Sequence, residues 1–237
     1  MEGTIGEGYM PKRLARPSEY AYEKGCRPVG KFADFLSVAL IIYAIVSALL
    51  ATSLLYTFFD SRMMDANAIE MATEDDWPLL LASVSFFLFY VAERILFVVC
   101  AFGVGRFTFR AMANLYTVRS AVPDMSPGST VFWYFVPFAN FVMPANAMSE
   151  IHHGTIAETG SLNTSSLASW WWSAWLGFTI LSTVSNLTSN YLILSVSTTC
   201  LASLSGAAAA LILRRLVRRI RSAQDQFTQG DLADTFA

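Results

Sequence analysis

Charged residues are scarce in this sequence, in which Asp, Glu, Lys and Arg make up 14% of 237 residues. Soluble domains carry roughly 25%. Hydrophobic residues reach 54%, and the mean hydropathy is +0.46. This composition excludes an ordinary soluble domain and indicates a membrane protein with several spans. Because the formal net charge is only -2, we also predict no nucleic-acid partner.

Cysteine is scarce as well. Cys26, Cys100 and Cys200 are far apart and form no C-x-x-C pair, which argues against a disulfide framework and against a cysteine zinc site. The serines and threonines of the later apolar segments have no histidine nearby in a nucleophile-and-base pattern. We therefore predict no cofactor and no enzymatic activity.

Histidine occurs only at positions 152 and 153. Glu150 and His153 have the spacing that puts a carboxylate and an imidazole on one helix face, as in di-iron bundles. Those bundles use the motif twice, together with further glutamates, so we expect a polar helix exit that stops at Gly154. A metal or haem site at Glu150 and His153 is the alternative.

Four apolar segments are long enough for the roughly 20 residues that a membrane-spanning helix needs. They cover residues 33–59, 77–104, 167–187 and 191–213. The third begins with tryptophans gathered like an interfacial aromatic belt, and a short uncharged turn joins it to the fourth. The predicted fold class is therefore all-α, a polytopic membrane helix bundle whose membrane domain covers residues 33–213.

Lysine and arginine fall in separate blocks, which predict the orientation in the membrane. The polar tail of residues 1–32 is basic, and we expect an uncleaved anchor after it, not a signal peptide. The loop over residues 60–76 holds Arg62 alone against six carboxylates, so we place it outside. The arginine-rich helix and tail of residues 214–237 belong inside, which makes both termini cytoplasmic.

One more apolar segment, residues 130–150, contains Pro137 and Pro144. Proline lacks an N–H and its ring displaces the carbonyl four residues earlier, which leaves the carbonyls of Trp133 and Asn140 without helical partners. In hydrocarbon, protein or water must satisfy such groups. A further crossing would put the C-terminal arginines outside, so we predict a re-entrant or interfacial segment, with a fifth span as the alternative.

Residues 107–122 have apolar side chains on one side and Arg106, Arg110 and Asn114 on another. This pattern favours an interfacial helix on the cytoplasmic side, whose arginines would meet anionic lipid headgroups. A plain cytoplasmic continuation of the second span is the alternative.

Four motifs follow one another in a fixed order from Phe107 to Trp175. They are Phe107-x-x-Arg110-x-x-x-Asn114, the turn Pro127-Gly128, Trp133-x-x-x-Pro137-x-x-Asn140-x-x-x-Pro144, and a tryptophan pair within residues 170–172. In these motifs the chain resembles the bacterial membrane family called domain of unknown function 4328. The resemblance implies a multi-pass protein of a bacterial inner membrane, and it brings no catalytic residue with it.

Two ionisable residues, Glu93 and Arg94, lie inside the second predicted span, where charges are costly and often functional. Adjacent positions on a helix do not face each other, so we expect no good pair between them. The structural interpretation gives Glu93 a donor such as Asn140 or Tyr43, and lets Arg94 reach the cytoplasmic surface. The functional interpretation is a proton or ligand site.

The fourth span carries a ridge of small residues, Ala202, Gly206 and Ala210, whose spacing of four allows close helix contact. Packing within the bundle and docking of a partner helix both explain this ridge. Arginines cluster beyond the span, where anionic lipid headgroups or a partner would meet them. They are Arg214, Arg215, Arg218 and Arg219.

These features predict a non-catalytic scaffold or accessory subunit of a larger membrane protein complex. Its partners would be membrane lipids and other integral membrane subunits. The alternative is a carrier or receptor for a small amphiphile or an ion, because transporters place their sites at broken helices. That site would lie at residues 137–144 and Glu93.

Overall fold

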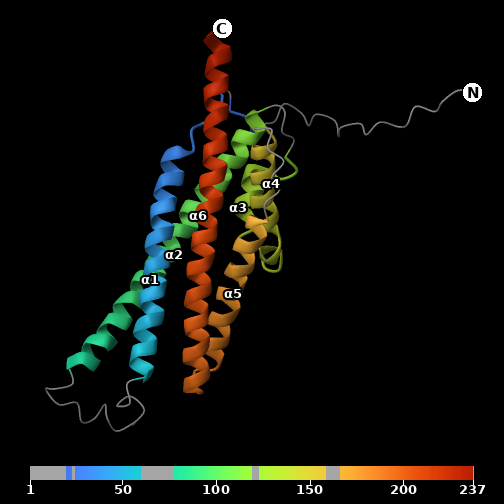
Figure 1. Cartoon of the computed structure of the whole chain (residues 1–237). Coiled ribbons are helices and arrows are strands. Elements are labelled where there is room, and N and C mark those ends of the chain that lie inside the picture. The colour runs from blue at the N-terminus through green and yellow to red at the C-terminus, as the bar shows by residue number, and fades with distance from the viewer. Residues whose placement is uncertain (1–19, 23–24, 60–76, 119–122, 159–165, 237) are drawn as a thin grey trace, which may run out of the picture.

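The structure is a computed structural model that describes residues 20–22, 25–59, 77–118, 123–158 and 166–236 (Figure 1). Within these ranges every regular element is helical, which confirms the all-α prediction. The elements are α1 (Gly30–Phe59), α2 (Trp77–Thr117), α3 (Pro127–Phe132), η3 (Ala139–Phe141), α4 (Met143–Glu158), α5 (Leu167–Leu187) and α6 (Leu192–Phe236). The predictions for residues 1–19 and 60–76 lie outside the described residues.

Three helices are long and apolar enough to cross a membrane. The qualifying segments are Gly30–Tyr56 in α1, Leu80–Thr117 in α2 and Leu192–Gln226 in α6. The chain is therefore a helical membrane protein. The third predicted span forms α5, a helix of 21 residues, which is not one of these three.

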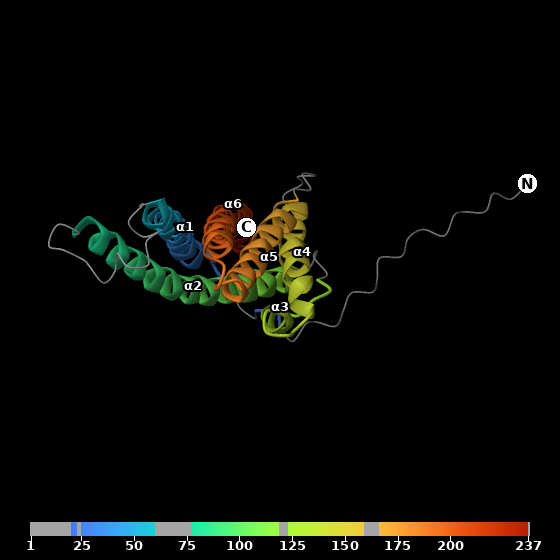
Figure 2. The same ribbon diagram turned by 90° about the horizontal axis from the view of Figure 1, so that it is seen from below.

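Helix α6 is the centre of the bundle, with α1 on one flank and α5 on another (Figures 1 and 2). Small residues make these contacts close. A Cβ on Gly206 of α6 would lie 3.1 Å from both Phe178 of α5 and the Tyr43 hydroxyl of α1. A Cβ on Gly177 of α5 would lie 2.9 Å from the Ser205 hydroxyl of α6. Glycine is therefore what lets these helices meet.

Helix α2 packs on α1 and crosses the bundle at a tilt, so that its C-terminal half reaches α3 and α4 (Figures 1 and 2). It runs unbroken to Thr117, which corrects the prediction of a separate interfacial helix over residues 107–122. Gly103 does not break α2 and leaves room for Leu36, which a Cβ would approach to 3.1 Å. The alternative prediction, that these residues continue the second span as one helix, agrees with α2 up to Thr117; residues 119–122 lie outside the described residues.

The double-proline segment folds as three short pieces instead of one bent helix. Helix α3 ends at Phe132, η3 follows, and α4 begins at Met143. Between them Phe138 has a positive φ of 63°, which is uncommon for an aromatic residue. Helices α3 and α4 lie beside the C-terminal half of α2 (Figure 1), and η3 contacts α4.

Helix α4 passes through Gly154 and continues to Glu158, which corrects the predicted stop at that glycine. A Cβ at Gly154 would lie 3.0 Å from a methyl group of Leu115 in α2. The glycine therefore serves the close approach of α4 to α2 and does not end the helix.

Candidate functional site

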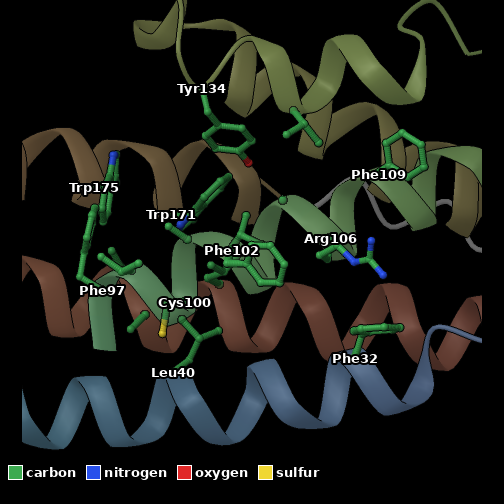
Figure 3. Close-up of a pocket in the computed structure, with 18 of the residues that line it drawn as sticks. Phe32, Leu40, Phe97, Cys100, Phe102, Arg106, Phe109, Tyr134, Trp171 and Trp175 are labelled. Carbon is green, nitrogen blue, oxygen red and sulfur yellow. The ribbon is translucent and has the colours of Figure 1, made fainter. Parts of the chain in front are cut away.

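A chamber of about 990 Å³ is lined by residues of α1, α2, α3, α5 and α6 and of the segment that follows α3 (Figure 3). Pockets for small molecules in proteins measure roughly 300–1,000 Å³ and are mostly apolar. Helix α1 lines the chamber with Phe32, Leu40 and Tyr43, and Tyr22 and Arg27 reach it from the segment before α1. The chamber is partly open, since its lining residues Phe102 and Phe135 are exposed. The chamber is therefore large enough for a sizeable ligand.

Arginines line one end of the chamber. Arg106 and Arg110, one turn apart on α2, lie over the ring of Phe32 at 5.5 and 5.0 Å from its centroid. Arg27 lies over the ring of Tyr22 at 4.2 Å. Within the described ranges, no carboxylate forms an ion pair with these three arginines. As far as the described residues extend, these guanidinium groups have no acidic partner and are available to an anion.

The opposite end of the chamber is aromatic. Phe97 of α2 stacks on Trp175 of α5, with ring centroids 5.3 Å apart and an interplanar angle of 8°. Trp175 also stacks with Trp172 at 6.4 Å. Phe97 precedes Arg106 by nine positions on one helix, which separates the two ends by about 14 Å. The chamber thus has a cationic end and an apolar end.

The double-proline segment, residues 130–150, contributes Tyr134, whose ring packs edge-on against the ring of Trp172, with centroids 6.2 Å apart and an interplanar angle of 73°. The indole N–H of Trp172 donates a hydrogen bond of 2.8 Å to the carbonyl of Phe141. Irregular backbone near hydrocarbon needs such a partner. Burial raises the pKa of the Tyr134 phenol, so its hydroxyl remains protonated.

A buried hydrogen-bond network fixes the segment that carries Arg27. The Asn114 side chain accepts from the Arg27 N–H at 3.0 Å and donates to the Arg27 carbonyl at 2.9 Å. It also donates to the Gln224 amide oxygen at 3.0 Å. Gln224 in turn donates to the Ala111 carbonyl and to Thr155. The network therefore ties α2, α4 and α6 to the cationic end.

A comparison with protein families matches residues 71–222 to the family described as Domain of unknown function (DUF4328). The match covers more than half of the 237-residue chain. The chain belongs to the DUF4328 family. Comparisons with curated proteins and with solved structures found no match. The family predicted from the four motifs is confirmed.

The DUF4328 motifs meet at the chamber although they are distant in sequence. Arg110, Gly128, Asn140 and Trp172 line it. Asn114, the partner of Arg110 in the first motif, holds the Arg27 segment at the cationic end. The motif residues therefore build one site.

The expectation that Glu93 and Arg94 do not pair needs correction. Arg94 Nη2 lies 2.5 Å from Glu93 Oε2, and the side chains are 46% and 1% exposed. The long arginine side chain curls back, so the different directions of the two Cβ atoms do not prevent the contact. Tyr43 and Ser47 donate to Glu93 Oε1 at 3.4 and 3.3 Å. Asn140, the other donor considered, lines the chamber instead.

Glu150 and His153 are not brought together as ligands. Glu150 Oε1 accepts from the backbone N–H groups of Asp124 and Met125, and burial raises the pKa of this carboxyl group. His153 is exposed, with Nδ1 3.4 Å from the Ser149 hydroxyl. Over the described part of the chain, no group of three or more His, Cys, Asp or Glu side chains is placed to hold a metal. Glu150 instead fixes the loop before α3.

The small-residue ridge faces the inside of the bundle. Ala202 and Ala210 are buried, and Gly206 approaches α1 and α5. These residues therefore pack α6 within its own chain. In the arginine cluster, Arg215, Arg218 and Arg219 are exposed, whereas Arg214 is half-buried. The cluster lies outside the chamber.

Sequence reasoning did not assign Arg27, Tyr134 or Trp172 to a site. Arg27 was counted only as a tail charge, and Tyr134 only as part of an apolar run. No local pattern indicates Trp172, because its indole donates to the carbonyl of Phe141, and the carbonyl that Pro144 leaves without a helical partner is that of Asn140.

Proposed function

We propose that this DUF4328 protein binds an anionic amphiphile in the chamber, with the acidic headgroup at the arginines and the chain at the aromatic end. The observation that carries the proposal is the set of arginines without carboxylate partners in the described chain, at one end of a cavity of about 990 Å³. This is the receptor or carrier predicted as the alternative. Its anion would bind Arg27, Arg106 and Arg110, at some distance from Glu93.

The headgroup would provide most of the selectivity. A lipid chain already lies in hydrocarbon, so its transfer into the chamber brings little hydrophobic free energy. Guanidinium groups form short, often bidentate hydrogen bonds with phosphate and carboxylate oxygens. Removal of two arginines should therefore weaken binding more than removal of apolar contacts.

The test compares hexadecyl phosphate with hexadecylphosphocholine, which share one chain and differ in net charge. Purified protein in phosphatidylcholine nanodiscs would be titrated with each probe, and native mass spectrometry would give the stoichiometry. We expect hexadecyl phosphate to bind more tightly. The variant with Arg106→Ala and Arg110→Ala should lose at least roughly tenfold in affinity, because hydrogen bonds to charged groups contribute about 1.5–3 kcal/mol each.

The matched control changes Arg215→Ala and Arg218→Ala, which removes the same charge from the exposed face of α6. This control should bind like the unchanged protein. Equal affinity for the two probes, or an equal loss in both double variants, would refute the proposal.

A role as an accessory subunit of a membrane complex remains a second proposal, supported by helix α2. Only 22% of the apolar stretch with which α2 could cross a membrane is buried inside the protein, against 50% of the corresponding stretch of α6. Exposed apolar residues follow one another along its N-terminal half and include Leu80, Leu81, Val84, Phe87 and Leu88. Lipid or a partner helix must cover this surface. A monomer without any co-purifying membrane protein, isolated in mild detergent, would count against the partner.

We also propose four crossings of a bacterial inner membrane, with both termini cytoplasmic and residues 130–150 re-entrant or interfacial. Helix α5 is about 31 Å long and runs beside α6, which supports a fourth crossing. Thr235→Cys in a cysteine-free background should resist an impermeant thiol reagent on intact cells. Labelling of that cysteine would place the C-terminus outside and refute this topology.

A further inference from the structure

The exposed part of the chamber lining comes from few elements. The residues that α1, α5 and α6 contribute are buried or half-buried. Exposed lining residues lie on α2, within residues 128–135 and at Arg27. The large apolar ones include Val98 and Phe102 of α2, which are 64% and 71% exposed, and Phe135, which is 79% exposed. We call the opening marked by these three side chains, Val98, Phe102 and Phe135, the mouth.

The mouth adjoins the part of the chamber assigned to the chain of the amphiphile. Val98 follows Phe97, which stacks on Trp175 at the aromatic end. In Figure 3, Phe102 lies between Phe97 and Arg106. Just beyond Phe102, α3 packs on α2, because a Cβ on Gly105 would lie 3.6 Å from Val131. The arginines of α2 follow this contact in the chain, whereas the mouth precedes it.

An exposed apolar stripe of α2 leads to the mouth. It consists of Val84, Leu88, Val91, Ile95, Val98 and Phe102, each 38–71% exposed. Steps of four and three residues keep these side chains on one face of the helix. The stripe lies within Leu80–Thr117, the stretch of α2 that is apolar enough to cross a membrane. The mouth therefore continues a surface that hydrocarbon covers in a bilayer.

The other edge of the mouth also suits contact with hydrocarbon. Residues 125–149 contain no charged side chain, and Phe132 and Phe138 are exposed like Phe135. The backbone here is irregular, but its N–H groups find partners inside the segment. Phe135 donates to the Phe132 carbonyl at 3.0 Å and Asn140 donates to the Val136 carbonyl at 2.9 Å. Such internal pairing is what backbone next to lipid requires.

We propose that the chamber opens sideways into the hydrocarbon of the membrane through this mouth, so that the bound amphiphile keeps its chain in contact with the bilayer. This inference rests on the proposed function. The arginines then select the headgroup, while the length of the chain is left open, because the part that exceeds the chamber remains among lipid tails. The ligand class is therefore a long-chain acidic lipid.

Spin labels test the position of the mouth without any ligand. Phe102→Cys and Phe135→Cys, each in a cysteine-free background, would be labelled and reconstituted in phosphatidylcholine nanodiscs. Oxygen concentrates in hydrocarbon, whereas a nickel chelate stays in water, so relaxation by each reagent reports the surroundings of the label. We expect both labels to be accessible to oxygen and shielded from nickel. Ile95→Cys, on the same stripe outside the chamber, is the matched reference for lipid, and Ser222→Cys, at an exposed site beside Arg221, is the reference for water.

The two other results overturn the inference. Access of nickel to both labels would mean that the mouth opens to water. Low access of both reagents would mean that a protein surface, from a second copy or another subunit, covers the mouth. Melting temperatures of the labelled variants show that each one is folded.

Chain length tests the contact of the bound ligand with the bilayer. Docosyl phosphate and hexadecyl phosphate share the headgroup and differ only in the length of the chain. Titrated at equal mole fractions in nanodiscs, they should bind within roughly twofold of each other, because the added methylenes lie in hydrocarbon before and after binding. A closed chamber would be overpacked by the longer chain and should bind it at least roughly fivefold more weakly.

The outcomes separate this inference from the proposed function. Weaker binding of docosyl phosphate, with hexadecyl phosphate still bound through Arg106 and Arg110, overturns the open mouth and leaves anion binding in place. Failure of both phosphates to bind overturns the proposed function, and with it the claim about the chain of the ligand. The spin labels then decide independently whether the chamber opens to lipid.

Discussion

Helix α6 has one closed side and one open side. Toward α5, Gly177 brings the helices together until a Cβ would lie 2.9 Å from the Ser205 hydroxyl. Toward α2, few residues of α6 make contact; Phe97 of α2 stacks on Trp175 of α5 instead, and residues of both α2 and α6 line the chamber. Within a membrane, helix contacts depend on packing, because lipid tails are as apolar as leucine. The size of the residues at each interface therefore decides which side of α6 closes.

The largest expected effect is a loss of stability at low pH that arises in α4. This helix packs on α2, α5 and α6 and so joins the two sides of α6. His152 in α4 is 1% exposed, and burial, with nearby His153 and Arg219, lowers the pKa of its imidazole from 6.5 to about 4. A depressed pKa in the folded state means that the neutral form stabilises the fold above pH 6.5 and that this stability is lost as pH falls toward 4. We expect a loss of up to about 3 kcal/mol, measured as a falling melting temperature in detergent.

His152→Gln should flatten this pH profile, whereas His153→Gln, at the exposed neighbour, should keep most of it. Glu150 acts in the opposite direction, because its raised pKa stabilises the fold at low pH. The profile of His152→Gln should therefore be level or rise slightly on acidification. An unchanged protein whose melting temperature does not depend on pH between 6.5 and 4 would contradict the assignment.

A larger residue at Gly177 should disturb the close contact between α5 and α6. Gly177→Val would force its side chain against Ser205 and should lower the stability by roughly 2 kcal/mol, the usual cost of overpacking. Gly128→Val is the matched control, because a Cβ there meets no described atom within 4 Å. Thermal unfolding in detergent measures both variants. If both melt at the same temperature, close packing does not hold α5 on α6.

The open side can be filled. Gly105 of α2 lines the chamber, and a Cβ there would lie at an ordinary 3.6 Å from Val131. Gly105→Phe should therefore weaken hexadecyl phosphate binding by roughly tenfold, about 1.4 kcal/mol, and leave the melting temperature unchanged. Unaltered binding would show that the probe lies elsewhere.

The smallest effect is expected from one hydroxyl on the closed side. Ser205 donates a hydrogen bond of 2.7 Å to the Ala174 carbonyl across the α5–α6 contact. Ser205→Ala should lower the stability by about 1 kcal/mol, as measured by thermal unfolding. Ser222→Ala is a suitable comparison, because that hydroxyl bonds locally to the Arg219 carbonyl at an exposed site.

The long apolar helices and the family were predictable from the sequence, because hydropathy and motif order are local properties. That residues 107–117 belong to α2, and not to a separate interfacial helix, was not predictable. The two-sided pattern of apolar and basic side chains favoured a separate interfacial helix, whereas α2 continues through Gly103, which leaves room for Leu36. A single sequence does not show which helix faces a glycine.

The chamber was predictable only in part. Two prolines indicated irregular backbone in residues 130–150, and that segment does contribute Tyr134 and Asn140 to the wall. The cationic end depends on a tertiary bond between Asn114 and Arg27, 87 residues apart, which no local pattern reveals. The pair of Glu93 with Arg94 was missed because Cβ direction was weighed without the reach of a long arginine side chain.

Helix α6 continues as one rod from the chamber wall, where Ala209 and Leu213 lie, to Phe236 near the end of the chain (Figure 1). From Leu213 to Phe236 this rod extends about 35 Å. A lever of that length converts a tilt of about 5° at the wall into a displacement of about 3 Å at its tip. A ligand that tilts α6 at the chamber would therefore displace the C-terminal end of the same helix, and no other element would have to move.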